Sequence, residues 1–246
     1  MAKKEWKEEL DAVKKHIDNP YIYHIWENYS FPNKFKGRLI ELNSNINVYE
    51  ACFLSQLVNT YIKTYKIKRS LNILEVGLAY GTSTLTIINK ARFFEGNVDY
   101  DIIDLQQTNR WEKIGIKHIE EFLKETKTKN VYYTVHEEFS TKVIPSLNKF
   151  YDIIFIDGGH STDVVLKDLI NSHEILLKNG LMILDDVKHP GVKAAILKFN
   201  NSHIKKYYRV IYVSDHKFIK IAKLYQKRFK RSFDNPDSMF CLQKII

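Results

Sequence analysis

Three carboxylates and a histidine directly follow two apolar runs of the sequence. Asp157 and His160 follow the first run, and Asp185 and Asp186 follow the second. If the two runs form neighbouring strands, the three carboxylates converge, and their repulsion requires a proton or a cation among them. Oxygen ligands in this number suit Mg²⁺ or a similar divalent ion. We therefore predict Asp157, Asp185 and Asp186 as metal ligands and His160 as a general base.

Each of these residues also has a purely structural interpretation. Asp157 is a turn former, the acidic pair could cap a helix that begins near Pro190, and His160 could be a surface histidine. The structural interpretation needs a separate explanation for Asp157, for His160 and for the acidic pair. A shared site explains all of them together, so we favour the functional interpretation.

A glycine-containing turn follows an earlier apolar run and suggests a ligand-binding loop. Gly77 and Gly81 allow a tight turn and a close approach of the backbone to a ligand. Glu75 ends the run, and a carboxylate buried there needs a partner, such as a ligand ammonium group or ribose hydroxyls. Thr82 or Ser83 could cap the following helix. The alternative is a tight turn in which Glu75 bonds to backbone amides.

Two further strand ends carry residues that fit a nucleotide-like ligand. Asp104 ends the second run, where an acid binds ribose hydroxyls in nucleotide-type α/β sites. Glu138 and Phe139 follow the third run and could frame a nucleobase, although Ser140 beside them could simply cap a helix.

The spacing of apolar runs predicts an α/β fold in one domain, 1–246, with a doubly wound, mostly parallel, Rossmann-like seven-stranded sheet. Fully apolar strands that alternate with amphipathic helices are typical of parallel sheets covered on both faces. The predicted strands are 71–76, 98–103, 131–135, 151–156, 181–184, 207–213 and 239–245. The predicted helices are 46–66, 82–92, 110–127, 140–149 and 163–177. Residues 1–68 are expected to form an N-terminal helical cap, and 69–246 the core, with a basic insertion near 216–236.

Composition limits the class of protein. The chain has 246 residues, 44% of them hydrophobic, which is enough for a sizeable core. We find no apolar segment that suits a signal peptide or a membrane span, and Cys52 and Cys241 fit neither a disulfide framework nor a metal motif. A cytoplasmic location is therefore expected. Nothing in the sequence decides whether the chain forms a homo-oligomer.

The net charge of +9 is concentrated in one segment, because 205–231 holds ten Lys or Arg residues and one acid. Such a segment could bind nucleic acid, an anionic substrate or a membrane surface. The favoured interpretation is a solvated, lysine-rich surface.

The stretch from Leu71 to about Ala195 resembles the class I S-adenosylmethionine-dependent methyltransferases. Residues 75–85, EVGLAYGTSTL, resemble the first motif of catechol and caffeoyl-coenzyme A O-methyltransferases. The segments FIDGGH at 155–160, LLKNG at 176–180, LDD at 184–186 and PGVKAA at 190–195 are closer to macrolide-sugar and cephalosporin-biosynthesis methyltransferase-like proteins. The chain departs from these relatives at Asn179, where Gly is more usual, and at Asp185, where some carry Glu.

The resemblance implies a metal-dependent O-methyltransferase that acts on a small molecule with a hydroxyl group. S-adenosylmethionine and Mg²⁺ are the implied cofactors. The implied cofactor-binding residues are Glu75, Gly77, Tyr80, Gly81, Thr82, Ser83, Asp104, Glu138, Phe139 and Asp157. Asp157, Asp185 and Asp186 would bind Mg²⁺, and His160 would act as the base. The alternatives are a nucleic acid or a nitrogen acceptor, and a cofactor-binding protein of the same fold without catalysis.

Overall fold

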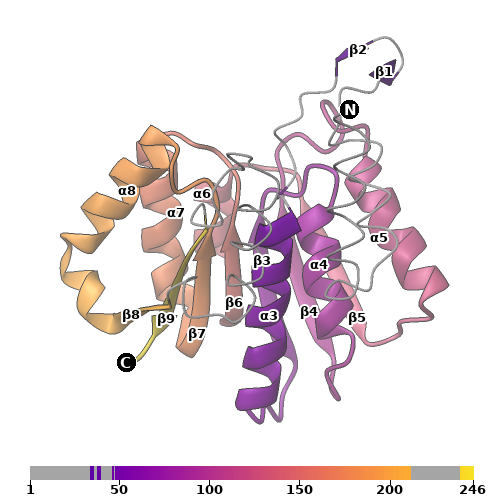
Figure 1. Ribbon diagram of the computed structural model, residues 1–246, viewed down its shortest axis with the longest axis horizontal. Helices are drawn as coiled ribbons and strands as arrows, with labels where there is room; N and C mark the ends of the chain where they lie inside the picture. The colour runs from indigo at the N-terminus through magenta and orange to yellow at the C-terminus, as the bar shows by residue number, and fades with distance from the viewer. Residues whose placement is uncertain (1–33, 36–37, 40–45, 47, 212–238) are drawn as a thin grey trace, which may run out of the picture. The chain divides into compact units, whose positions relative to one another are not determined.

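The computed structural model describes residues 34–35, 38–39, 46, 48–211 and 239–246 (Figure 1). Most of the predicted N-terminal cap, and the predicted insertion near 216–236, therefore lie outside the described residues. The chain divides into two compact units. The helical unit comprises 1–66, 78–95 and 106–131, and the sheet unit comprises 67–77, 96–105 and 132–246.

The helical unit is built on α3 (Val48–Thr64), α4 (Thr82–Ala91) and α5 (Ile114–Glu125). In α3, Ala51, Leu54 and Val58 are fully buried at helical spacing, which gives the helix one apolar face. This helix packs against α4, and α4 contacts α5. The short strands β1 (Lys34–Phe35) and β2 (Arg38–Leu39) pair antiparallel.

The sheet unit carries a seven-stranded sheet in the order β5-β4-β3-β6-β7-β9-β8. The strands are β3 (Leu71–Val76), β4 (Val98–Ile103), β5 (Val131–His136), β6 (Tyr151–Ile156), β7 (Leu176–Leu184), β8 (Tyr208–Ile211) and β9 (Phe240–Lys244). β3 pairs parallel with β4 and with β6, and β6 pairs parallel with β7. β9 runs antiparallel to both β7 and β8. The predicted Rossmann-like, mostly parallel sheet is thereby confirmed.

The strand order reverses at β3, which lies between β4 and β6 although β4 follows it in the chain. In open α/β sheets, ligands bind outside the carboxyl ends of the strands at such a switch point. The register aligns these ends closely, because Val76 pairs with Ile103 on one side and with Ile156 on the other. The next strand continues the alignment, since Ile156 pairs with Leu184.

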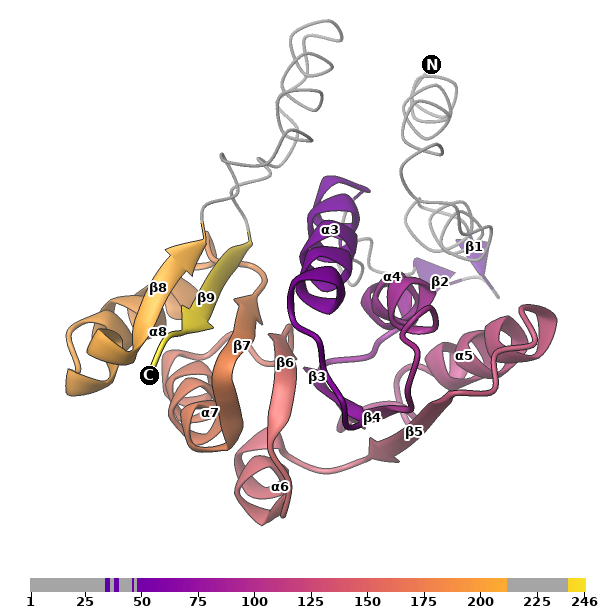
Figure 2. The ribbon, with the colours of Figure 1, turned by 90° about the horizontal axis from the view of Figure 1, so that it is seen from below.

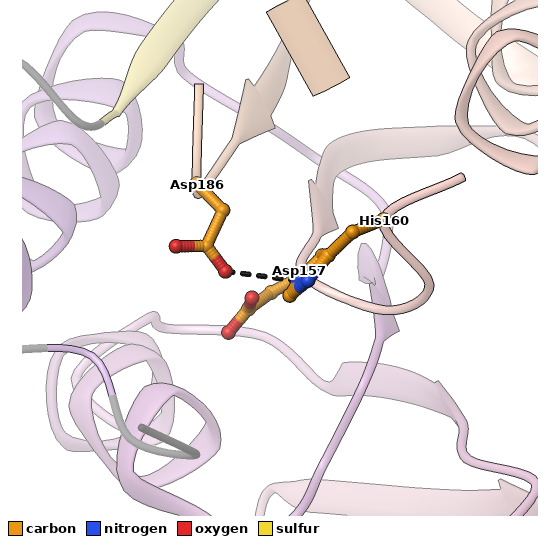
Figure 3. A group of neighbouring side chains, drawn as sticks. All are labelled: Asp157, His160 and Asp186. Carbon is orange, nitrogen blue, oxygen red and sulfur yellow. Dashed lines mark ion pairs between the residues drawn. The ribbon is translucent and has the colours of Figure 1, made fainter. Parts of the chain in front are cut away.

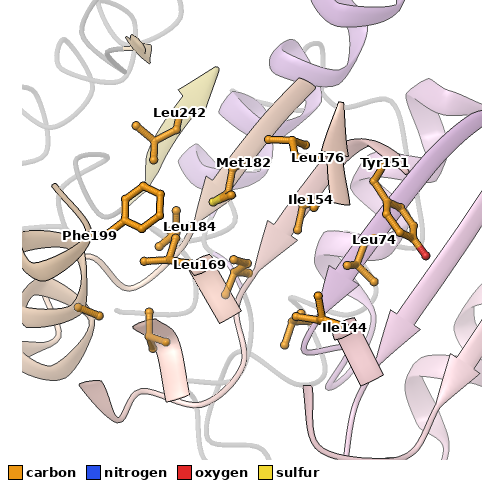
Figure 4. Close-up of a cluster of buried hydrophobic side chains, with 14 of the residues drawn as sticks. Leu74, Ile144, Tyr151, Ile154, Leu169, Leu176, Met182, Leu184, Phe199 and Leu242 are labelled. Carbon is orange, nitrogen blue, oxygen red and sulfur yellow. The ribbon is translucent and has the colours of Figure 1, made fainter. Parts of the chain in front are cut away.

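Helices α6 (Ser140–Ser146), α7 (Thr162–Ile175) and α8 (Pro190–Asn200) pack on one face of this sheet (Figure 2). Their contact with β3, β6, β7 and β9 forms an apolar core of the sheet unit, part of which is shown in Figure 4. Ile154, Met182 and Phe199 are each at most 1% exposed. The 3-10 helix η1 (His203–Tyr207) then leads into β8.

β7 begins earlier than the sequence predicts. Residues 176–180 were expected to finish a helix and enter a turn, but α7 ends at Ile175 and the chain is already extended from Leu176. The cause is tertiary: Leu176 pairs with Tyr151 and is 1% exposed, so burial overrides the local helical pattern. A register irregularity between Tyr151 and Ile153 accommodates the extra length of β7.

Candidate active site

The carboxyl ends of β6 and β7 bring two acidic side chains and an imidazole together. Asp157, His160 and Asp186 each offer a ligand atom, and these atoms all lie within 4.8 Å of one another (Figure 3). We call these three residues the donor cluster. Asp157 and His160 lie on the loop after β6, and Asp186 lies after β7, as expected for neighbouring parallel strands.

Asp186 reaches the cluster because the chain turns sharply after β7. Its φ of 53° lies in the left-handed region, which aspartate tolerates better than most residues. The backbone N–H of His189 donates to the Asp186 carbonyl at 2.8 Å and closes this turn.

Asp185, the other predicted ligand on this strand, has a different environment. It is 7% exposed, and it lines a cavity of about 10 Å³ together with Asp157 and His160. Asp185 is therefore near the donor cluster but outside it, and its role as a ligand stays a prediction.

His160 forms an ion pair with Asp186, with 2.9 Å between His160 Nε2 and Asp186 Oδ2. The hydrogen bond and the negative charge of Asp186 raise the pKa of His160, against the opposing effect of partial burial. The imidazole is 40% exposed, so it remains accessible from solvent.

The N-terminus of α8 holds the His160 loop in place. A Cβ at Gly191 would lie 2.1 Å from the His160 carbonyl oxygen, so only glycine permits this approach. The His189 ring lies 4.8 Å from the His160 ring, centroid to centroid. His189 caps α8, since its Nδ1 accepts a hydrogen bond from the Gly191 N–H at 3.3 Å. The Nδ1 lone pair of His189 is therefore engaged.

Two carboxylates and one imidazole are donors that suit a divalent cation. A cation among them would also offset the repulsion between Asp157 and Asp186, a task that His160 performs alone when protonated. The donor chemistry thus fits a metal site, and it equally fits an acid–base pair made by His160 and Asp186.

The predicted cofactor residues of the sheet unit lie at adjacent strand ends. The Gly77 N–H donates to the Ile103 carbonyl at 2.8 Å, and the Asp157 N–H donates to the Val76 carbonyl at 2.8 Å. Asp104, which is 8% exposed, follows Ile103 directly. The structure therefore brings Gly77, Asp104 and Asp157 together at the switch point.

Contacts within the protein itself explain why residue 77 is a glycine. Its φ is 97°, and a Cβ there would lie 2.0 Å from the Asp157 carbonyl oxygen. Glu75 is fully buried, and the Tyr100 hydroxyl donates to its Oε2 at 2.6 Å. A partner for the Glu75 carboxylate is therefore already present in the protein, and its predicted contact with the cofactor stays a prediction.

Glu138 and Phe139 follow the end of β5, where Glu138 is half-buried and Phe139 is exposed. Phe139 is 53% exposed and is the N-cap residue of α6, while its backbone N–H donates to Glu138 Oε1 at 2.8 Å. This bond and the nearby Lys142 hold the pKa of Glu138 below its ordinary value. Ser140 does not cap the helix; its hydroxyl donates to Asp168 at 2.9 Å.

The helical unit holds the remaining predicted cofactor residues. Gly81, with φ 88°, is the N-cap of α4, so neither Thr82 nor Ser83 caps this helix, and both are buried. The Tyr80 carbonyl lies 2.9 Å from His118 Nδ1, and the Tyr80 ring lies 5.0 Å from that of Trp111.

Asp101 on β4 forms a buried polar cluster that sequence reasoning missed. Its carboxylate bonds to His136 at 2.9 Å and to the Tyr151 hydroxyl at 2.8 Å, and it pairs with Lys149. Burial alone would raise the pKa of Asp101, but these hydrogen bonds lower it below its ordinary value. In the sequence, Asp101 is one of two acids that alternate with apolar residues in β4. This pattern does not reveal its partners, because they come from distant parts of the chain.

Comparison with known proteins identifies the class. Residues 74–187 match the family model of the methyltransferase domain. A search of curated proteins finds no match. Within the described part of the chain, no helix combines the length and the apolar character that a membrane crossing needs.

Solved structures share the fold at low sequence identity. A candidate O-methyltransferase from Klebsiella pneumoniae has a TM-score of 0.59 and 14% identity, over 92% of this chain and 90% of that one. An O-methyltransferase from Bacillus cereus in complex with S-adenosylhomocysteine has a TM-score of 0.56 and 14% identity, over 96% of each chain. A candidate rRNA methylase from Clostridium thermocellum has a TM-score of 0.53 and 14% identity, over 78% and 95%.

The domain match at 74–187 and the sheet order support a class I S-adenosylmethionine-dependent methyltransferase, as the first motif and the FIDGGH segment predicted. The chain carries the methyltransferase domain at 74–187, which contains the donor cluster and the glycine turn.

Proposed function

We propose that the protein transfers a methyl group from S-adenosylmethionine to a hydroxyl oxygen of a small molecule such as a sugar, a natural product or a catechol-like compound. We further propose that Mg²⁺ or a similar divalent cation assists the reaction. The observation that carries this proposal is the donor cluster, in which three ligand atoms lie within 4.8 Å at the ends of β6 and β7.

Asp157 and Asp186 would hold the cation, with Asp185 as the predicted third ligand. When bound, the cation would lower the pKa of the acceptor hydroxyl and fix its orientation. Asp185 is 7% exposed and borders the same small cavity as Asp157 and His160, which supports its place in the proposed set.

His160 is the group best placed to take the proton of the acceptor. Its Nε2 lies on the side of Asp186, whose carboxylate stabilises the imidazolium that forms. His189 is less suitable, because its Nδ1 already accepts a hydrogen bond from the Gly191 N–H. Protonation of neutral His160 would convert its contact with Asp186 into an ion pair.

The transfer itself is an in-line displacement. The acceptor oxygen forms a bond to the methyl carbon, the bond from that carbon to the sulfonium sulfur breaks, and the proton of the hydroxyl passes to His160. S-adenosylhomocysteine is the product. The protein contributes mainly position, since a fixed near-attack geometry removes much of the entropic barrier. Gly77, Asp104 and Asp157 are the predicted cofactor contacts at the switch point.

Cofactor binding is the first test of this proposal. S-adenosylhomocysteine should raise the melting temperature, because a ligand that binds only the folded state stabilises it. A shift produced by NAD and not by S-adenosylhomocysteine would overturn the assignment.

Metal binding is tested by titrating the protein with Mn²⁺ and measuring free Mn²⁺ by electron paramagnetic resonance. Asp157→Asn and Asp186→Asn should each weaken binding at least tenfold. Asp163→Asn is the matched control, because Asp163 is 88% exposed on α7 and outside the donor cluster. Equal Mn²⁺ binding by the wild type and the Asp186→Asn variant, or full methyl transfer in EDTA, would contradict the proposed metal.

A nucleic acid acceptor is the second candidate. The lysine and arginine surplus at 205–231 supports it, as does the structural similarity to a candidate rRNA methylase. The small-molecule acceptor is preferred because the donor cluster could hold a cation that orients and acidifies an acceptor hydroxyl.

A further inference from the structure

A cavity of about 330 Å³ in the sheet unit borders the loop after β7, which carries Asp186 of the donor cluster. The loop after β7, helix α8 and the first residue of β9 line it, through Val187, Lys188, Lys193, Ile196, Leu197 and Phe240. Lys188 follows Asp186 by two residues. Phe240 pairs with Leu184 across the sheet, so the far wall of the cavity also borders the end of β7.

The apolar wall of this cavity adjoins the core, because Val187, Ile196 and Phe240 are partly buried against it. α8 buries Val192, Ala195 and Phe199 against the sheet. Lys193, Ile196 and Leu197 share a second face of the helix, because residues three and four apart are neighbours on a helix surface. Leu197 is 55% exposed although it is a large apolar side chain. A second apolar face that opens onto a cavity is typical of a ligand-binding wall.

The polar part of the lining is entirely cationic. Lys188 and Lys193 are exposed, and neither forms an ion pair with any residue that the structure describes. The next lysine of α8 differs, since Lys198 lies 4.0 Å from Asp163 and is not part of the lining. Two ammonium groups at the rim of an apolar cavity would attract a ligand that carries a negative charge.

We infer that this cavity binds the methyl acceptor, and that the acceptor is an anion: a hydroxylated compound with an apolar body and a carboxylate or phosphate group. The inference rests on the proposed function. The volume is at the lower end of small-molecule sites, which run from about 300 to 1,000 Å³. The apolar body would contact Leu197 and Phe240, the anionic group would meet the two lysines, and the hydroxyl would point toward Asp186.

The test compares matched ligands that differ only in charge. Binding of 3,4-dihydroxybenzoate and of its neutral amide is measured by titration calorimetry in the presence of S-adenosylhomocysteine and Mg²⁺. The benzoate should bind at least tenfold more tightly than the amide. In the double variant Lys188→Met, Lys193→Met this preference should disappear, while Lys198→Met should retain it. Phenyl phosphate, compared with phenol, shows which of the two anions the lysines prefer.

An anion preference that needs Lys188 and Lys193 supports the inference. Equal affinity for the benzoate and the amide, no binding of either anion, or a preference that survives in the double variant would overturn it. A second variant, Leu197→Ser, should weaken both ligands alike if the apolar wall contacts the ring. Methylation is measured separately: binding without methyl transfer counts against the proposed function, and transfer without an anion preference counts against this inference.

Discussion

Replacing Asp168 by asparagine should stabilise the protein above pH 7. Asp168 lies on α7 and is fully buried; Ser140 donates to one carboxylate oxygen, and the other has no hydrogen-bond partner within the described structure. Burial raises its pKa from 3.8 to about 6. That difference of about 2.2 pK units, at about 1.4 kcal/mol each, makes the ionised form cost about 3 kcal/mol of folding free energy.

The sign follows from proton linkage. Between pH 3.8 and about 6 the folded chain retains the proton on Asp168 while the unfolded chain loses it, so the wild type loses stability as the pH rises through this window. Above about pH 6 the loss is complete. Asparagine does not titrate, so the Asp168→Asn variant lacks this loss.

Urea unfolding at pH 4.5 and 7.5 measures the effect. The Asp168→Asn variant should be more stable than the wild type at pH 7.5 by up to about 3 kcal/mol, and about 2 kcal/mol of that gain should vanish at pH 4.5. Asp163→Asn, which changes an exposed acid on the same helix, should give curves parallel to the wild type at both values. A variant gain that does not depend on pH, or a loss at pH 7.5, would refute the reasoning.

Three further predictions concern the site. Gly191→Ala should destabilise the protein by about 1–3 kcal/mol and weaken Mn²⁺ binding, because the new Cβ would overlap the His160 carbonyl. Gly159→Ala is the control, because its Cβ would lie 3.5 Å from Val164. Equal effects of the two substitutions would contradict this prediction. His160→Ala should lower kcat by about 10²–10⁴ with KM nearly unchanged, as steady-state kinetics on an acceptor that the wild type methylates would show; unchanged kcat would remove His160 as the base. Binding of generic RNA through 205–231 should be weak and vanish at moderate salt in filter-binding assays; submicromolar, sequence-selective binding at physiological salt would favour a nucleic acid acceptor.

The sheet could be predicted from the sequence because its central strands are buried on both faces. The apolar run Ile153–Ile156 has few alternatives to a central strand, and every residue of it is buried. The start of β7 could not be predicted in the same way. Residues 176–180 carry no strand pattern, and only the pairing of Leu176 with Tyr151 makes them extended.

The residues of the candidate site that follow from the positions of strand ends could be predicted. The directions in which their side chains point could not. Asp157, His160 and the acidic pair follow from the rule that parallel strands end at one edge. Which acid of the pair faces His160 depends on the left-handed turn at Asp186, and the sequence does not reveal that turn. The cavity beside α8 was likewise missed, although a second apolar face at Ile196 and Leu197 was a usable signal.

The pairing of β8 with β9 has a consequence for how much the chain between them can vary. Ile211 pairs with Cys241, so the chain leaves the sheet and returns to it at adjacent points, beside Phe240 in the wall of the cavity. Residues 212–238 therefore connect two neighbouring points of the sheet, and each doubling of such a connection costs only about 0.6 kcal/mol in closure entropy. The length of this connection can therefore vary at little cost, while the strand register and the loops after β6 and β7 remain intact.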